Sequence, residues 1–188
     1  MRQAVISLGS NVDKEKNMPA AVALISERCR LLAVSPVYET LPMGLHNQGN
    51  FLNAALLVET ERSPQELKAE VLDWLERKLG RVRQDNRNAP RTIDADLTLY
   101  DGAILDYTGH HVPDPDLLRF AHVAVPVADL LPEAHHPETG EPLVALAERL
   151  ANRAAKKYGV HVLWPRPDFD LLTALASLPA DLTGDSET

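Results

Sequence analysis

The stretch GRVRQDNRNAPRTIDADLTLY, from Gly80 to Tyr100, decides which site and which fold this sequence predicts. Its first half is unusually basic for a protein whose formal net charge is -8. A local positive field of this kind suits an anion, and phosphate is the natural candidate because arginine pairs with its oxygens through two parallel hydrogen bonds. Between positions 77 and 91 one acid, Asp85, stands against six basic residues: Arg77, Lys78, Arg81, Arg83, Arg87 and Arg91.

Two aspartates follow in the second half, which reads as a strand from Thr92 to Tyr100. Asp94 and Asp96 are two positions apart, so their side chains would point to the same face of the sheet. Two bare carboxylates about 6 Å apart repel by roughly 3 kcal/mol at an effective dielectric constant near 20. A magnesium ion, which binds carboxylates together with substrate phosphates, would remove that repulsion. We therefore expect a site for magnesium and a nucleotide, suited to phosphoryl-type transfer.

Each half of this stretch also has an ordinary explanation. An arginine-rich loop is commonly a solvated surface, and an Asp-x-Asp pair on a strand commonly arises by chance. The glycine-rich nucleotide loops G-x-x-x-x-G-K and G-x-G-x-x-G are absent from the sequence. The residue pattern alone therefore leaves a functional site and a solvated surface both open.

The elements on either side of this stretch predict the fold class. A helix with Asn17 as its N-cap follows the first strand, and a Ser-Pro-Gln-Glu capping box at Ser63 starts the second helix. The resulting order is that of a ferredoxin-like α+β fold, βαββαβ, an antiparallel sheet with helices on one face and C-terminal additions. We expect a single domain over residues 1–164 and a partly frayed tail over residues 165–188. The four predicted strands are 3–8, 31–38, 51–60 and 92–100, and the additions are an irregular segment with short helices at 113–142, a helix at 142–158 and a short strand at 160–163.

Composition limits the function classes. The chain has 188 residues, and its 45% hydrophobic and 24% charged residues are ordinary for a globular protein. An RNA-binding module on a ferredoxin-like sheet is an alternative, but 5% aromatic residues and the net charge of -8 argue against nucleic acid and membrane-surface partners. The single cysteine, Cys29, excludes an internal disulfide. With no apolar run of about 18 residues and no cleavable leader pattern, we expect a cytoplasmic protein, either a monomer or a homodimer.

The stretch from Gly80 resembles the signature of the 6-hydroxymethyl-7,8-dihydropterin pyrophosphokinase family, G-R-x-R-x-x-x-x-x-x-P-R-x-[IL]-D-x-D. The segments SLGSN, VYETLPMG, NFLNAALLVET and SPQELKAEVLDWLERKLGR resemble the first strand and turn, the pterin-side loop, the following strand and the second helix of that family. Together they cover residues 3 to about 131 in the expected order. The resemblance implies transfer of the pyrophosphoryl group of ATP to the hydroxymethyl oxygen of the pterin, with release of AMP, in folate biosynthesis.

The resemblance also implies roles for individual residues. Asp94 and Asp96 would bind two Mg²⁺ ions, and Arg81 and Arg91 would be the catalytic arginines that hold phosphates. ATP would contact a second group of residues, Glu76, Arg83, Arg87 and Arg119. The pterin would contact a third group, Gly9, Thr40, Pro42, Met43, Phe51, Asn53 and His122.

One segment departs from the family pattern. Where the family has P-H-P-R-L-x-x-R-x-F, this chain has PDPDLLRFAH from Pro113 to His122. Asp114 and Asp116 replace a histidine and an arginine, and Phe120 stands at the second arginine position, one residue after Arg119. A relative of the family with a changed or lost acceptor pocket is therefore an alternative at this point.

Overall fold

The computed structural model describes residues 1–42, 48–82, 89–158 and 163–178. Three of the predicted site residues, Met43, Arg83 and Arg87, lie outside these ranges. The first part of the chain forms β1 (Arg2–Ser10), α1 (Lys14–Ser26), β2 (Arg30–Val34), β3 (Tyr38–Thr40), β4 (Phe51–Thr60), α2 (Pro64–Glu66), the π-helical segment η1 (Leu67–Leu72), α3 (Asp73–Lys78) and β5 (Asp94–Tyr100). The second part forms β6 (Leu105–Tyr107), β7 (His110–Val112), the 3-10 turn η2 (Pro115–Leu118), α4 (Ala121–Leu130), α5 (Leu143–Tyr158), β8 (Leu163–Pro165) and α6 (Leu171–Ala176).

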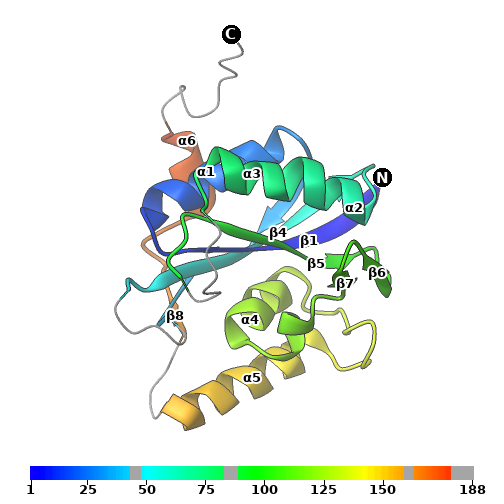
Figure 1. Cartoon of the computed structure of the whole chain (residues 1–188). Coiled ribbons are helices and arrows are strands. Elements are labelled where there is room, and N and C mark those ends of the chain that lie inside the picture. Colours follow the sequence, from blue (N-terminus) through cyan, green and yellow to red (C-terminus); the bar gives the residue numbers. More distant parts are fainter. Residues whose placement is uncertain (43–47, 83–88, 159–162, 179–188) are drawn as a thin grey trace.

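The main sheet is antiparallel and confirms the predicted fold class. Its strands run in the order β5-β1-β4-β3-β8, and β2 also pairs with β4. The four strands of the βαββαβ core therefore lie in the order β5-β1-β4-β2, with the first strand in the interior. This is the arrangement that a ferredoxin-like fold requires, and Figure 1 shows the helices α1, α2 and α3 together on one side of the sheet.

The main core fills the space between the sheet and these helices. Alternate residues of β1 and β4 point into it, which follows from the twofold repeat of a strand. The capping box at Ser63 forms as the sequence predicts, because the Ser63 side chain accepts from the Glu66 N–H and the Glu66 carboxylate accepts from the Ser63 N–H. Core residues include Ala4, Ile6, Leu8, Leu52, Leu56, Leu67, Val71, Leu75 and Leu97.

The C-terminal additions cover the opposite face of the sheet. The segment predicted to be irregular with short helices contains η2 and α4, and α4 packs with α5 below the strands in Figure 1. Their second core is built on the other set of alternate strand residues, Val5, Ala55 and Leu99. The start of α4 borders the end of the sheet where Gly9 and Asp94 lie, and the candidate site is at this end.

Several local predictions differ from the structure. α1 begins at Lys14, three residues before Asn17, and the Asn17 side chain donates to the Val12 carbonyl instead of capping the helix. The strand expected over residues 31–38 is interrupted between β2 and β3, where Ser35 exchanges two hydrogen bonds with Ala55. The last strand is β8 at Leu163–Pro165, which overlaps the predicted strand only at Leu163.

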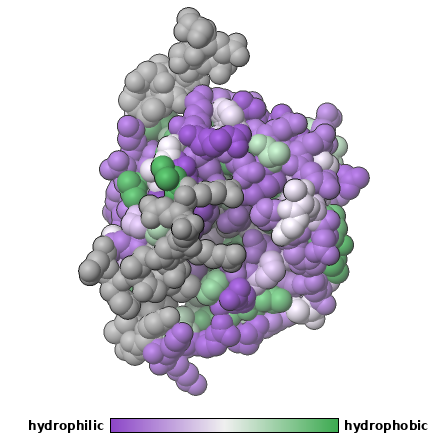
Figure 2. Space-filling view, viewed as in Figure 1, coloured by the Kyte–Doolittle hydropathy of each residue, from purple (hydrophilic) through white to green (hydrophobic). Residues whose placement is uncertain are grey.

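The described part of the C-terminal segment contains α6, which packs on α1 through the buried Leu171. The division of the chain at residue 164 stays a prediction. The face of the molecule seen in Figure 2 is mostly hydrophilic, with small, separate hydrophobic spots. Among the described residues, no helix has the length and apolar character that crossing a membrane would require.

Candidate active site

A pocket of about 740 Å³ opens beside the start of α4, on the sheet face that α4 and α5 cover in part. Its floor is a row of paired residues across three strands, in which Gly9 of β1 lies between Asn53 of β4 and Asp94 of β5. A methyl group on Gly9 would lie 3.5 Å from the Asn53 Oδ1 atom and 3.9 Å from the Asp94 Cβ atom. Because Gly9 has no side chain, a flat gap lies between the amide of Asn53 and the carboxylate of Asp94.

Most of the predicted site residues meet at this pocket. Pro42 is described but does not line it. Phe120 and the unpredicted Lys68, Asp114 and Asp116 also contribute to the wall. The predicted residues that line the pocket are Gly9, Thr40, Phe51, Asn53, Glu76, Arg81, Arg91, Asp94, Asp96, Arg119 and His122.

Asp94 is the centre of an arginine–carboxylate cluster. Nη1 of Arg81 donates to the carboxylates of Asp94 and Glu76, and Nη1 of Arg91 donates to the other oxygen of Asp94. Burial alone would raise the pKa of Asp94, but the two guanidinium groups outweigh it and lower that pKa. Asp94 is therefore ionised, and both arginines already bind an anion in the free protein.

Local structure aims the two arginines at this cluster. Gly80 ends α3 with φ of 71°, a conformation that favours glycine. The turn allows the N–H of Arg81 to donate to the Glu76 carbonyl, so Arg81 folds back toward the helix. Arg91 is anchored to the end of β1, because its N–H donates to Asn11 Oδ1 at 2.8 Å and its carbonyl accepts from the N–H of Asn11 at 3.1 Å.

Asp96 lies in a more negative environment than Asp94. Burial, together with the charges of Asp94, Asp114 and Glu76, raises the pKa of Asp96 to about 7, although Lys68 acts in the opposite direction. The Nζ atom of Lys68 is 3.8 Å from Asp96 Oδ1. A cation beside Asp96 would offset the repulsion from these carboxylates.

The donor set fits a hard divalent cation. Asp94 and Asp96 offer oxygen ligands on one face of β5, as the sequence predicts. Within the part of the chain that the structure describes, no three His, Cys, Asp or Glu side chains are grouped closely enough to hold a metal ion alone. Magnesium typically binds one or two carboxylates and completes its shell with water and substrate phosphates, so two aspartates suffice.

Lys68 is a site residue that the sequence did not reveal. It is buried, it pairs with Asp73 at 3.2 Å, and its ammonium group reaches the Ala95 carbonyl at 3.5 Å. The Ala95 N–H donates to Glu76 Oε1 at 3.2 Å, so the outer edge of β5 between the two aspartates is closed by side chains. A lysine beside Leu67 reads as a solvent-exposed helix position, and its contact to a strand 27 residues later gives no local signal.

On the β4 side of the pocket, the polar Asn53 lies between apolar residues of its strand. The Asn53 Nδ2 group donates to Thr40 Oγ1 at 2.9 Å, and both residues are buried. The Asn53 Oδ1 atom therefore faces the gap above Gly9 as an acceptor. Phe51 lies beside it, with the Arg91 guanidinium carbon 5.8 Å from the ring centre. The Asn53 side chain can therefore hydrogen-bond the polar edge of a flat ring.

The segment that departs from the family pattern lines one side of the pocket. The rings of Phe120 and His122 are stacked, with centres 5.3 Å apart and planes 20° apart. Burial lowers the pKa of His122 to about 4, so the ring is neutral near pH 7. Arg119 does line the pocket, but it is exposed and pairs with Asp116 at 3.2 Å. Asp114 caps η2, and burial raises its pKa.

The fold and the site together define an α+β protein with an arginine–carboxylate pocket for an anionic ligand. A family model described as 7,8-dihydro-6-hydroxymethylpterin-pyrophosphokinase (HPPK) matches residues 5–132. The chain belongs to this family, as its resemblance in sequence predicted. All eleven predicted residues that line the pocket lie within the matched range.

Two relatives in sequence support this assignment, and one solved structure has a similar fold. The 2-amino-4-hydroxy-6-hydroxymethyldihydropteridine pyrophosphokinase of Pseudomonas aeruginosa is 34% identical over 141 residues, which cover 73% of this chain and 86% of that protein. The folic acid synthesis protein fol1 of Schizosaccharomyces pombe is 32% identical over 158 residues, but the match spans only 21% of that protein. The wild-type HPPK-DHPS of Plasmodium falciparum is similar in fold, with a TM-score of 0.67, 12% identity, and coverage of 86% of this chain and 47% of that chain.

Proposed function

We propose that this chain transfers the pyrophosphoryl group of ATP to 6-hydroxymethyl-7,8-dihydropterin, the reaction for which its family is named. The hydroxymethyl oxygen forms a bond to the β-phosphorus of ATP, the bond between that phosphorus and the α-phosphate oxygen breaks, and AMP and a proton are released. The observation that carries the proposal is the convergence of Arg81 and Arg91 on Asp94, beside Asp96, at the edge of the gap above Gly9. Phosphate groups and a flat ring then fit adjacent parts of one pocket.

Asp94 and Asp96 are the residues that would hold two Mg²⁺ ions. The raised pKa of Asp96, caused by burial and by neighbouring carboxylates, supports this role. When bound, the ions would neutralise phosphate charge and so favour attack by the weakly nucleophilic hydroxyl. Lys68 and Glu76 hold the strand between the two aspartates and thereby fix the spacing of the carboxylates.

Arg81 and Arg91 bind the phosphate oxygens in this proposal. In the free protein they are engaged by Asp94, and a cation that takes over this carboxylate releases their donors for phosphate. Arginines in such a position can contribute about 10³-fold or more to phosphoryl transfer. The remaining ATP contacts are assigned to Glu76 and Arg119, and to Arg83 and Arg87, which lie outside the described residues.

The acceptor ring occupies the gap above Gly9. Asn53 Oδ1 accepts a hydrogen bond from the polar edge of the ring. Thr40 fixes the amide of Asn53 so that this oxygen faces the ligand. Phe51 and the neutral His122 supply flat surfaces on which the ring stacks. Pro42 and Met43 belong to the same proposed group, although Pro42 does not line the pocket and Met43 lies outside the described residues.

The test is AMP release from ATP and Mg²⁺, measured with and without 6-hydroxymethyl-7,8-dihydropterin. We expect pterin-dependent AMP formation that the double variant Asp94→Ala/Asp96→Ala abolishes. The matched control is Asp106→Ala, because Asp106 is exposed on β6 and lies outside the pocket. Release of ADP in place of AMP would mean that a single phosphoryl group is transferred, and would refute pyrophosphoryl transfer. Magnesium-dependent ATP binding without pterin-dependent turnover would refute the pterin as the acceptor substrate. It would support the alternative of a changed acceptor pocket.

A further inference from the structure

The C-terminal segment pairs with β3, the strand that carries the pocket residue Thr40, although it lies beyond the residues that the family model matches. β8 adds to the sheet by pairing with β3, and the register places Trp164 opposite Glu39 and Leu163 opposite Thr40. Arg166 follows directly, and its N–H donates to the Val37 carbonyl at 2.8 Å. The segment is therefore fixed to the strand that carries a pocket residue.

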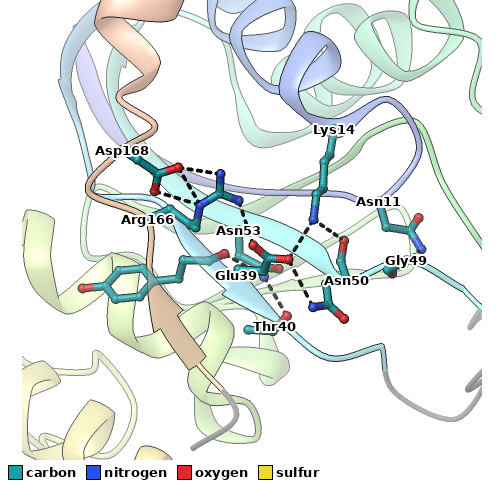
Figure 3. A network of polar contacts seen from close by, with 10 residues as sticks. Asn11, Lys14, Glu39, Thr40, Gly49, Asn50, Asn53, Arg166 and Asp168 are labelled. Carbon is teal, nitrogen blue, oxygen red and sulfur yellow. Dashed lines mark hydrogen bonds and ion pairs between the residues drawn. The ribbon is translucent and has the colours of Figure 1, made fainter.

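Glu39 connects this segment to the rest of the site. Its carboxylate accepts from Arg166 Nη1 at 2.7 Å and from Lys14 Nζ at 3.0 Å. It also accepts from Asn50 Nδ2 at 3.1 Å, and the Lys14 ammonium donates to the Asn50 carbonyl at 3.0 Å. Figure 3 shows these donors, which come from α1, from the start of β4 and from the C-terminal segment, converging on one carboxylate.

The network is only partly open to solvent, so its ion pairs are worth more than surface pairs. The side chains of Lys14, Glu39 and Arg166 are 16%, 21% and 23% exposed. Burial would raise the pKa of Glu39, but the hydrogen bonds from Lys14, Asn50 and Arg166 outweigh it and lower that pKa. Glu39 is therefore a charged group held in place by three segments.

The next residue along β3 faces the pocket. Successive side chains of a strand point to opposite faces, so Thr40 lies on the pocket side while Glu39 points to the α1 side. Thr40 Oγ1 accepts from Asn53, and Asn53 also donates to the Tyr38 carbonyl at 3.4 Å. Any shift of β3 would therefore move two of the acceptors that orient Asn53.

We propose that Arg166 is a positioning residue for the acceptor side of the pocket, because its contact with Glu39 fixes β3 and thereby Thr40. Arg166 acts through Glu39 and touches neither substrate. The kinetic part of this inference rests on the proposed pyrophosphokinase activity, and the structural part does not.

The kinetic test uses Arg166→Ala. We expect the KM for the pterin to rise about tenfold, since small displacements of orienting groups cost factors of this order or more, while the KM for ATP and kcat stay near the wild-type values. Arg166→Lys should be intermediate, because one donor to Glu39 remains possible. The matched control is Arg149→Ala, which breaks the ion pair of this α5 residue with Glu141 and lies outside the Glu39 network. It should leave the KM for the pterin unchanged.

A double-mutant cycle and amide hydrogen exchange complete the test. In a Glu39→Gln background, Arg166→Ala should change the KM for the pterin much less than in the wild type. The amides of Thr40 and Asn53 should exchange faster in Arg166→Ala and at the wild-type rate in Arg149→Ala. Equal effects on both substrates, additive effects in the cycle, or unchanged exchange would each overturn the inference. If the wild type makes no pterin-dependent AMP, the proposed function fails, and the exchange rates still decide whether Arg166 fixes β3.

Discussion

Replacing Asp94 by Asn tests the centre of the proposed site. The side chains of Asp94, Arg81 and Arg91 are 23%, 17% and 19% exposed, so the cluster is largely shielded from water. Removing one partner of a buried ion pair costs about 3–5 kcal/mol. Because these groups keep some access to water and Arg81 also binds Glu76, we expect the free energy of unfolding to fall by about 2 kcal/mol.

The same change should separate the binding of ATP from the effect of magnesium. In the wild type without Mg²⁺, the Asp94 carboxylate competes with phosphate for the donors of both arginines. Asp94→Asn removes this competitor, so ATP without magnesium should bind at least as tightly as it does to the wild type. The extra affinity that Mg²⁺ gives should largely disappear, because one of its two carboxylates is gone. AMP formation should drop by about 100-fold or more, the usual cost of losing one such electrostatic contact.

Three measurements decide this prediction. Urea unfolding should show a midpoint lower by roughly 1 M, given a slope of about 2 kcal/mol per molar urea for a domain of this size. Calorimetric titration with ATP, with and without Mg²⁺, reports binding, and AMP release reports turnover. The control is Asp106→Asn, whose side chain is 86% exposed and bound to His111, and which should behave as the wild type. An Asp94→Asn protein that keeps full magnesium dependence and turnover would refute the role given to Asp94.

Three further substitutions test other parts of the pocket. Gly9→Ala should leave the unfolding temperature nearly unchanged, because the added methyl meets no atom closer than 3.5 Å, yet it should raise the KM for the pterin about tenfold by filling the floor. Lys68→Met, compared with Lys68→Arg, should lower AMP formation about tenfold, because the edge of β5 beside Asp96 loses its cation. His122 has a pKa of about 4, lowered by burial, against about 6.5 in an unfolded chain, so the unfolded chain binds its proton first as pH falls and stability is lost between pH 6.5 and pH 4. His122→Phe should therefore remove about 1 kcal/mol of the stability difference between pH 7 and pH 5, measured by urea unfolding.

Local sequence signals predicted the parts of the fold that local physics determines. β4 has the predicted bounds, Phe51 to Thr60, because its alternate residues face two apolar layers. The capping box at Ser63 formed as expected because all of its hydrogen bonds join residues three apart. Asp94 and Asp96 lie on one face of β5 as predicted, because side chains two positions apart on a strand point to the same face. The roles of these two residues remain proposals.

Tertiary contacts explain what the sequence did not reveal. The sequence predicted short helices in the proline-rich stretch but not their bounds; α4 forms there, although it contains Pro126, because its apolar face is buried against the sheet. Lys68 and Arg166 owe their positions to partners far along the chain, in β5 and β3. Such contacts depend on which elements become neighbours, and no periodicity or capping pattern encodes that.

The basic loop of an acidic protein is explained by an exchange of partners in this proposal. In the free protein the two arginines neutralise Asp94, so neither a bare carboxylate nor a bare guanidinium is buried. Magnesium held by Asp94 and Asp96 would free Arg81 and Arg91 for the phosphates of ATP, so that each arginine would exchange a carboxylate for a phosphate. No buried charge loses its partner at any stage, which matters because an uncompensated buried charge costs several kcal/mol. Asp96, whose pKa is raised to about 7 by burial and by Asp94, Asp114 and Glu76, would then gain most from the cation.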